Sequence, residues 1–203
     1  VAQDTTRYGV DLYGELSLAK LLKQLCSIES IKWYRILYAY PECVTDELLE
    51  VMASQPKIAK YLDLPLQHVN FQVLKRMNRR GDAVSLTQLI RHIREKVPGI
   101  TLRTTLIAGF PGETKQQFGE LCEWVKEMKI ERLGCFAYSQ EENTPAALLD
   151  GQLDEETKQH RAELVMETQM EIHERLNQKM LGKTITLLVE GFDKYAECYF
   201  GRG

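Results

Sequence analysis

The stretch TLRTTLIAGFPGET, residues 101–114, begins as an apolar run and ends in two glycines, a proline, an acid and a threonine. The apolar run predicts a buried strand over 102–110. Pro111 and Gly112 suit the central positions of a type II turn, because glycine adopts the positive φ that the second of them requires. Thr114 and Gln117 then form a capping box at the start of a helix. We therefore expect a strand that passes through a tight corner into a helix.

The same order of strand and helix extends to both sides of this stretch. Apolar runs at 35–40, 61–66 and 133–138 predict three further strands, and Val1-Ala2 resembles the end of another. Helical periodicity separates the runs, and Ser85 with Gln88 fits a second capping box. Strands that alternate with helices predict a parallel α/β sheet, with too few units for a complete eight-stranded barrel.

After Pro145 the pattern changes to a long helix, predicted over 154–181 with Gly182 as its left-handed stop. A strand is expected next, then a turn and the start of a second strand, at 184–190, 191–194 and 196–200. The predicted domains are a core, a linker helix and the start of a small β module, at 1–150, 151–181 and 182–203.

The composition is that of an ordinary globular protein, with 44% hydrophobic and 27% charged residues in 203. A net charge of −3 gives no general reason to bind nucleic acid or a membrane, and no apolar run is long enough to span a bilayer. Five widely spaced cysteines without a CxxC pair exclude a disulfide scaffold and a self-contained zinc or iron–sulfur site. We expect reduced thiols in a cytoplasmic protein, and both chain ends resemble cuts within a larger one.

Ligands of parallel sheets bind beyond the carboxyl ends of the strands, so the residues that follow each strand are the candidates. Gly109 would let a ligand approach the backbone, although a tight corner explains the glycine equally well. Gln67 and His68 follow another strand, and a lone histidine is more often structural than catalytic. Arg103 lies within a strand and requires a carboxylate partner, which is either a structural acid or a ligand.

A basic cluster follows Gln67 and His68 along the chain, with Lys75, Arg76, Arg79 and Arg80 in six residues. One interpretation is a solvated helix end, where cations are favoured by the helix dipole. The other is a docking patch for an anionic partner. The sequence contains no Ser-His-Asp set, no metal-ligand pair and no P-loop.

Four motifs in order resemble the RimO family of radical S-adenosylmethionine methylthiotransferases, and the resemblance covers the whole chain. They are QDTTRYG at 3–9, YLDLPLQHVN with LKRMNRRG at 61–81, TLRTTLIAGFPGET at 101–114 and FAYSQEENTPA at 136–146. The sister MiaB family of tRNA methylthiotransferases shares GFPGET but differs from this chain at residues 3–6 and 67–70. The family usually has glycine where this chain has Asn143, a residue that also tolerates positive φ.

The resemblance implies a partial radical-SAM (β/α) barrel without its first strand, a linker helix and the beginning of a TRAM domain. It implies that Gln3, Asp4 and Thr5 face the methionine end of S-adenosylmethionine, and that Gln67 and His68 face its ribose and methionyl part. Five more positions are implied at the same site: Arg103 at the methionyl carboxylate, Ile107 and Gly109 at the adenine, and Tyr138 with Ser139 closing the site. No catalytic residue and no metal ligand falls within this chain, because the family's CxxxCxxC motif would lie upstream of Val1.

The implied activity is methylthiolation of an aspartyl β-carbon in ribosomal protein S-twelve, with S-adenosylmethionine and two [4Fe–4S] clusters in the full-length protein. The implied partners are S-twelve, the small ribosomal subunit and an electron donor that the sequence does not identify. Two alternatives stay open from the residues alone. The chain could belong to a tRNA methylthiotransferase, or it could be a non-radical αβ domain that binds a nucleotide as a scaffold.

Overall fold

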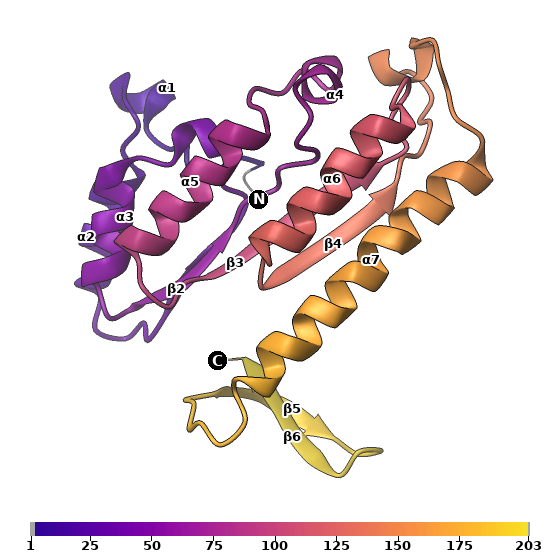
Figure 1. The fold of residues 1–203 in the computed structure, drawn as a ribbon. Coiled ribbons are helices and arrows are strands. Elements are labelled where there is room, and N and C mark those ends of the chain that lie inside the picture. The colour runs from indigo at the N-terminus through magenta and orange to yellow at the C-terminus, as the bar shows by residue number, and fades with distance from the viewer. Residues whose placement is uncertain (1–2, 203) are drawn as a thin grey trace. The chain divides into compact units, whose positions relative to one another are not determined.

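The computed structural model describes residues 3–202, so the strand end expected at Val1-Ala2 lies outside the described residues. The chain divides into two compact units, residues 1–173 and 174–203 (Figure 1). The division falls inside the long helix. The domain boundaries expected at 150 and 181 therefore stay predictions.

The first unit contains a four-stranded parallel sheet in the order β1-β2-β3-β4. The strands are β1 Tyr34–Ile36, β2 Ile58–Asp63, β3 Thr101–Ala108 and β4 Arg132–Ala137. All four predicted strands are found, but β2 begins and ends three residues before the predicted 61–66, and β1 ends before the predicted residue 40. Tyr38 adopts a positive φ of 57°, which takes the backbone out of the extended conformation before residue 40.

Helices follow the strands as predicted. They are α2 Leu18–Cys26, α3 Asp46–Ser54, α5 Ala83–Lys96 and α6 Lys115–Met128, with the short helices α1 Val10–Tyr13 and α4 Phe71–Arg76. Two 3₁₀ turns, Pro41–Cys43 and Pro145–Leu148, complete the connections. The capping box of Thr114 and Gln117 is confirmed at the start of α6.

The capping box predicted at Ser85 is wrong by one turn of helix. Asp82 is the N-cap of α5, and its carboxylate accepts a hydrogen bond from the Ser85 backbone N–H at 2.8 Å. The Ser85 hydroxyl accepts in return from the Asp82 N–H at 3.0 Å. Ser85 is therefore the third helical residue of the box and not its first, because the carboxylate of Asp82 provides the better acceptor.

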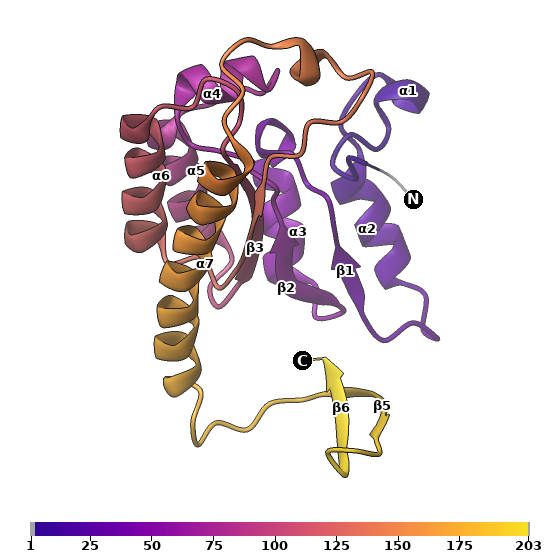
Figure 2. The same cartoon turned by 90° about the vertical axis from the view of Figure 1, so that its right-hand side faces the viewer.

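The sheet is covered by helices on one face, where α3, α5 and α6 lie side by side (Figure 1, and from the side in Figure 2). Residues of β3 alternate accordingly between buried and half-buried. The buried set faces the helices and consists of Leu102, Thr104, Leu106 and Ala108. The half-buried set, Thr101, Arg103, Thr105 and Ile107, lies on the opposite face. This second face carries the candidate site.

Helix α7, Glu155–Gln178, is shorter than the predicted 154–181, and Gly182 lies beyond its end. Its first part is an integral part of the first unit. Gln169 donates from its side-chain amide to the Ile130 carbonyl at 3.0 Å, and the Cys135 N–H approaches the Met166 sulfur at 3.2 Å. The helix therefore covers the edge of the sheet at β4.

The second unit contains an antiparallel hairpin of β5, Leu188–Asp193, and β6, Cys198–Arg202. The turn predicted at 191–194 is wrong, since Gly191 and Phe192 belong to β5 and pair with Phe200 and Tyr199. The carboxylate of Asp193 instead accepts from the N–H groups of Tyr195 and Ala196, at 2.8 and 3.1 Å. This side-chain bond moves the turn towards the C-terminus.

Candidate functional site

A cavity of about 410 Å³ opens at the carboxyl ends of β3 and β4, where a parallel sheet places its ligands. Four of the predicted site residues line it: Gln67, Ile107, Tyr138 and Ser139. The remaining lining residues are Thr105, Phe136, Ala137, Glu141, Thr144 and Ala146. Most of the surface is apolar, and the polar groups are few.

Gln67 reaches the cavity because its backbone extends the sheet beyond β2. Its N–H donates to the Thr105 carbonyl at 2.9 Å, and its own carbonyl accepts from the Ile107 N–H at 2.8 Å. The residue adopts a φ of 70°, which is uncommon outside glycine and asparagine. A glutamine gives no sequence signal for that conformation.

Tyr138 forms one wall of the cavity and is 7% exposed. Its ring packs edge-on against Phe110 at 5.1 Å, and the Lys158 ammonium lies 5.4 Å from the ring centre. The Tyr138 hydroxyl is buried and has no hydrogen-bond partner among residues 3–202. A buried unpaired hydroxyl costs about 1–3 kcal/mol.

Arg103 has a structural carboxylate as its partner. Its guanidinium donates to Asp63 at 2.9 Å, where Asp63 is 2% and the Arg103 side chain 41% exposed. Asp63 and Arg103 are paired residues of β2 and β3 and therefore lie side by side. Of the two partners that the sequence left open for Arg103, a structural acid or a ligand, the structure contains the structural acid. The exposed part of the guanidinium stays accessible on the face of β3 that carries Ile107.

Gly109 has a φ of 76°, and a Cβ there would lie 2.7 Å from Cγ and 3.0 Å from Cα of Lys158 in α7. A neighbouring helix is therefore sufficient to require this glycine. Its N–H donates to the Glu113 carboxylate at 2.9 Å. Contact of Gly109 with an adenine stays a prediction.

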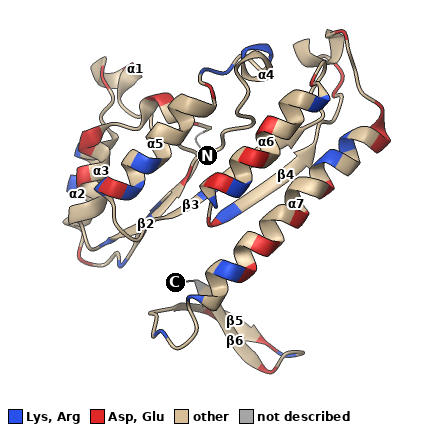
Figure 3. Ribbon diagram, in the orientation of Figure 1, with Lys and Arg blue, Asp and Glu red and all other residues tan. Residues whose placement is uncertain are grey.

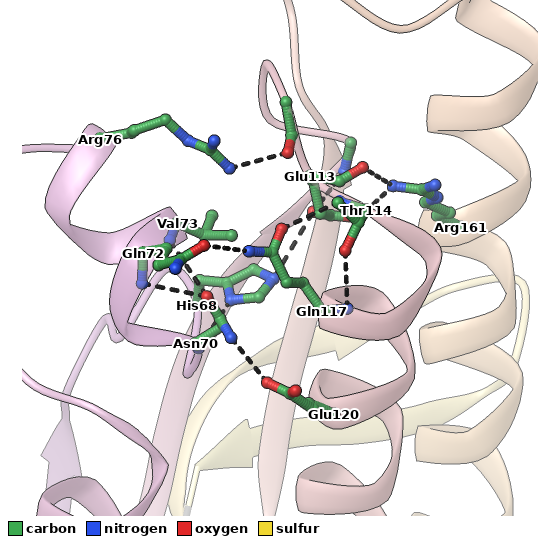
Figure 4. A network of polar contacts seen from close by, with 12 residues as sticks. His68, Asn70, Gln72, Val73, Arg76, Glu113, Thr114, Gln117, Glu120 and Arg161 are labelled. Carbon is green, nitrogen blue, oxygen red and sulfur yellow. Dashed lines mark hydrogen bonds and ion pairs between the residues drawn. The ribbon is translucent and has the colours of Figure 1, made fainter. Parts of the chain in front are cut away.

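Glu113 is the centre of a buried polar network (Figure 4). Besides Gly109, its carboxylate binds the Arg161 guanidinium at 2.6 Å, and Arg161 also donates to the Glu113 carbonyl at 2.9 Å. The neighbouring turn has the predicted geometry, since Gly112 has a φ of 73° and the Glu113 N–H donates to the Phe110 carbonyl. The turn is thus bonded directly to α7.

His68 belongs to this network and does not line the cavity. Its ring is fully buried, with Nε2 3.5 Å from Glu113 Oε2 and Nδ1 accepting from the Asn70 N–H at 2.9 Å. Asn70 in turn caps α4 and donates to Glu120 of α6 at 2.6 Å (Figure 4). The structural interpretation of this histidine is the one that the geometry supports.

The loop with Gln3, Asp4 and Thr5 lies beside the carboxyl end of β1. The Thr5 N–H donates to the Tyr38 carbonyl at 3.0 Å, and the Asp4 carboxylate accepts from the Thr6 N–H at 3.0 Å. Gln3 is exposed. None of the three is among the cavity residues, so their contact with a ligand stays a prediction.

The described residues contain no group of three or more His, Cys, Asp or Glu side chains that could hold a metal ion. The five cysteines are free. Burial raises the pKa of the Cys135 thiol to about 12, which keeps it protonated. A thiol in this state is a poor metal ligand.

Sequence reasoning did not identify several cavity residues. Thr105 could have been found, because it lies between Arg103 and Ile107 on one face of an alternating strand. Phe136 required the register, in which it pairs with Ile107. Thr144 and Ala146 reach the cavity through a turn in which Asn143 has the expected positive φ of 63°.

Comparisons with known proteins agree on the type of fold. The family model described as the radical SAM superfamily matches residues 4–125. The coproporphyrinogen III oxidase HemN of Escherichia coli, described as a radical SAM enzyme, has a similar fold. Its TM-score is 0.53 at 20% identity, over 82% of this chain and 38% of that one.

Curated relatives are considerably closer in sequence. The chain is 48% identical over 202 residues to the "Ribosomal protein uS12 methylthiotransferase RimO" of Alkaliphilus oremlandii, covering 100% of the chain and 46% of the relative. It is 50% identical over 190 residues to the protein of that name from Desulfitobacterium hafniense, covering 94% and 43%. The chain thus spans about half the length of these relatives. Within residues 3–202, the helices are too short or too polar to cross a membrane.

Proposed function

The chain belongs to the radical SAM superfamily, and from this premise we propose that it is the core of a ribosomal protein uS12 methylthiotransferase. The observation that carries the proposal is an identity of 45–50% over almost the whole chain with proteins of that name. The reaction would add a methylthio group to an aspartyl β-carbon of uS12. The predicted α/β fold of a partial radical-SAM barrel agrees with the four parallel strands.

The cavity fits S-adenosylmethionine. Its volume of about 410 Å³ lies within the range of small-molecule sites, about 300–1,000 Å³. Ile107 and Phe136 provide apolar surface for the adenine ring. Gln67 and Ser139 provide polar atoms for the sugar and the methionyl part.

Arg103 would bind the methionyl carboxylate. It lies on the same face of β3 as Thr105 and Ile107, and Asp63 holds its guanidinium from one side. A planar guanidinium can bind two carboxylates at once, because its five N–H groups point in different directions. Gln3, Asp4 and Thr5 would approach the same end of the ligand from the loop beside β1.

When bound, S-adenosylmethionine supplies the radical chemistry that an unactivated β-carbon requires. The residues of this chain bind and orient the cofactor and keep water away. This division of labour agrees with a site that contains apolar walls and single polar groups but no acid–base pair. The network around Glu113 would hold the cavity walls in place from behind.

A [4Fe–4S] cluster does not fit the residues of this chain. The described part offers no suitable ligand group, and Cys135 is kept protonated by burial. We place the cluster ligands, two sets as the family resemblance implies, in parts of the longer protein outside these 203 residues.

The β5–β6 hairpin would be the start of a TRAM domain at 182–203, with a linker helix at 151–181 and the core at 1–150. The small ribosomal subunit is the proposed partner beyond uS12 itself. A substrate of this kind would place the enzyme in the cytoplasm.

The test uses the full-length protein, reconstituted anaerobically with iron and sulfide and then reduced. Mass spectrometry would detect a methylthiolated uS12 peptide, with tRNA offered in a parallel reaction. Modification of tRNA alone would move the chain to the sister activity. No modification of either substrate, with intact clusters, would contradict the radical-enzyme proposal and leave a nucleotide-binding scaffold.

A pair of variants tests the site separately. Ile107→Arg fills the cavity with a charge and should abolish S-adenosylmethionine binding in calorimetry. Val84→Arg places the same charge on α5, where the side chain is 66% exposed, and should bind normally. Normal binding by the Ile107 variant would reject the site and leave the function proposal standing.

A further inference from the structure

The segment 71–80 carries an unusual concentration of positive charge for this protein. Between Asp63 and Asp82 the sequence contains no acid, whereas Lys75, Arg76, Arg79 and Arg80 lie within six residues. Figure 3 shows these cations gathered on α4 and the loop after it. The chain as a whole has a net charge of −3, so the cluster does not reflect a generally basic surface.

Two of the four cations have structural tasks. Arg76 donates to the Gly112 carbonyl at 2.9 Å and joins α4 to the turn beyond β3. The Arg79 guanidinium stacks on the Tyr40 ring at 4.5 Å and donates to its hydroxyl at 3.2 Å. Together these contacts hold the segment in one position on the barrel.

The other two cations have no such task. Lys75 and Arg80 are exposed, and neither forms an ion pair within the part of the chain that the structure describes. Several other exposed cations are neutralised, as in the pairs of Lys20 with Glu15 at 2.6 Å and of Lys126 with Glu123 at 2.8 Å. An exposed cation without a carboxylate partner is available to an external anion.

An exposed aromatic ring accompanies the free cations. Phe71 is 57% exposed and lies four residues before Lys75, so the two side chains share one face of α4. Single-stranded nucleic acids bind surfaces that combine cations with an aromatic ring, because their phosphates attract the cations and their bases stack on the ring. An acidic peptide would need the cations but would gain little from the ring.

The opposite face of α4 forms the back of the cofactor cavity. Val73 packs in one cluster with Phe110 and Tyr138, and Met77 and Ile107 pack against that cluster. An α-helix is about 10–12 Å wide, so a partner on the outer face of α4 would lie about one helix diameter from the cavity wall.

We propose that Phe71, Lys75 and Arg80 form a binding surface for an RNA strand beside the cofactor cavity. The inference rests on the proposed function, because a ribosomal protein presented on its particle brings RNA with it. RNA bound there would hold the substrate's particle against α4, about one helix diameter from the cavity wall. The surface itself can be tested without turnover.

The experiment measures the fluorescence anisotropy of a labelled, mixed-sequence single-stranded RNA with the full-length, cluster-loaded protein over a salt series. Lys75→Ala/Arg80→Ala should weaken binding on the order of twentyfold at about 0.1 M salt and make the slope of log Kd against log salt shallower by about 1.4. Phe71→Ala should weaken binding roughly tenfold with an unchanged slope, since it removes stacking and no charge.

The matched control is Lys20→Ala/Lys126→Ala, which removes the same charge from two paired, exposed lysines and should leave the slope unchanged. Equal effects of both double variants on RNA affinity would overturn the proposal, because they would indicate that binding depends on net charge alone. The proposal would also be overturned if Lys75→Ala/Arg80→Ala lost affinity for an acidic peptide and kept its affinity for RNA, because that result would indicate a protein partner. S-adenosylmethionine cleavage by these variants should stay at the level of the unmodified protein, so a failure of the proposed function would be seen separately.

Discussion

The carboxylate of Glu113 binds the guanidinium of Arg161 at 2.6 Å, with both side chains at most 8% exposed and 48 residues apart in the chain. Glu113 ends the corner beyond β3, and Arg161 lies in α7. The same carboxylate accepts from the Gly109 N–H and lies beside the His68 ring. One side chain thus joins the corner, the loop before α4 and the long helix.

Neutralising this carboxylate should destabilise the protein strongly. Glu113→Gln leaves the Arg161 charge buried and unpaired, at a cost of about 3–5 kcal/mol in the free energy of unfolding. Urea denaturation would measure the loss. Glu127→Gln, which removes the exposed partner of Arg91, should cost at most about 1 kcal/mol.

The double variant Glu113→Gln/Arg161→Met tests the origin of that loss. Removing both charges should recover part of the stability, because no unpaired ion is then buried. Additive losses from the two substitutions would contradict a direct ion pair.

Gly109→Ala should separate helix packing from ligand binding as the reason for the glycine. The new Cβ would lie 2.7 Å from the Lys158 side chain, at a φ of 76° that alanine disfavours. We expect a loss of about 2–4 kcal/mol in the free energy of unfolding without any ligand present.

The matched control for this variant is Gly119→Ala in α6. A Cβ at that position meets no atom within 4 Å, so the helix should gain about 0.5–1 kcal/mol. If Gly109→Ala were as stable as the unmodified protein and only bound ligand weakly, the packing explanation would be wrong.

Tyr138→Phe should not lower stability and should leave binding unchanged. Deleting the unpaired hydroxyl leaves the free energy of unfolding of the ligand-free protein unchanged or higher by about 1 kcal/mol. Affinity for S-adenosylmethionine should stay the same, since the buried hydroxyl does not reach the cavity. Thermal unfolding and calorimetry measure the two quantities, with the fully exposed Tyr195→Phe as control. A fall in stability would indicate that the hydroxyl has a partner within the protein.

The cap of α5 should make stability depend on pH. The Ser85 backbone N–H and then its hydroxyl lower the pKa of the Asp82 carboxyl below its ordinary value of 3.8. A lowered pKa in the folded state stabilises the protein above pH 3.8, and this contribution is lost as the pH falls through the lower, folded value. Asp82→Ala should therefore be less stable than the unmodified protein at pH 7, and the difference should shrink below pH 3.8. Urea unfolding at several pH values would check this, and a constant difference down to acid pH would exclude the carboxylate charge as its cause.

The four strands and the order of the main helices could be predicted because their signals are local. An apolar run such as 102–108 needs no distant partner to be recognised, and Thr114 with Gln117 cap α6 within one turn of helix. Gln67 could be placed at the ligand edge because it follows a predicted strand, whereas Ile107, Tyr138 and Ser139 were implied by the family resemblance.

The partners of individual side chains depend on contacts between residues far apart in the chain. Asp63 neutralises Arg103 across two strands, Lys158 occupies the space that Gly109 leaves, and His68 is buried against Glu113. A local pattern carries no information on contacts of this range, because they form only when the helices close over the sheet. Local patterns in the chain are enough to locate the strands, the helices and the ligand edge. Contacts across the fold select which polar residues support the site from behind and which of them face a ligand.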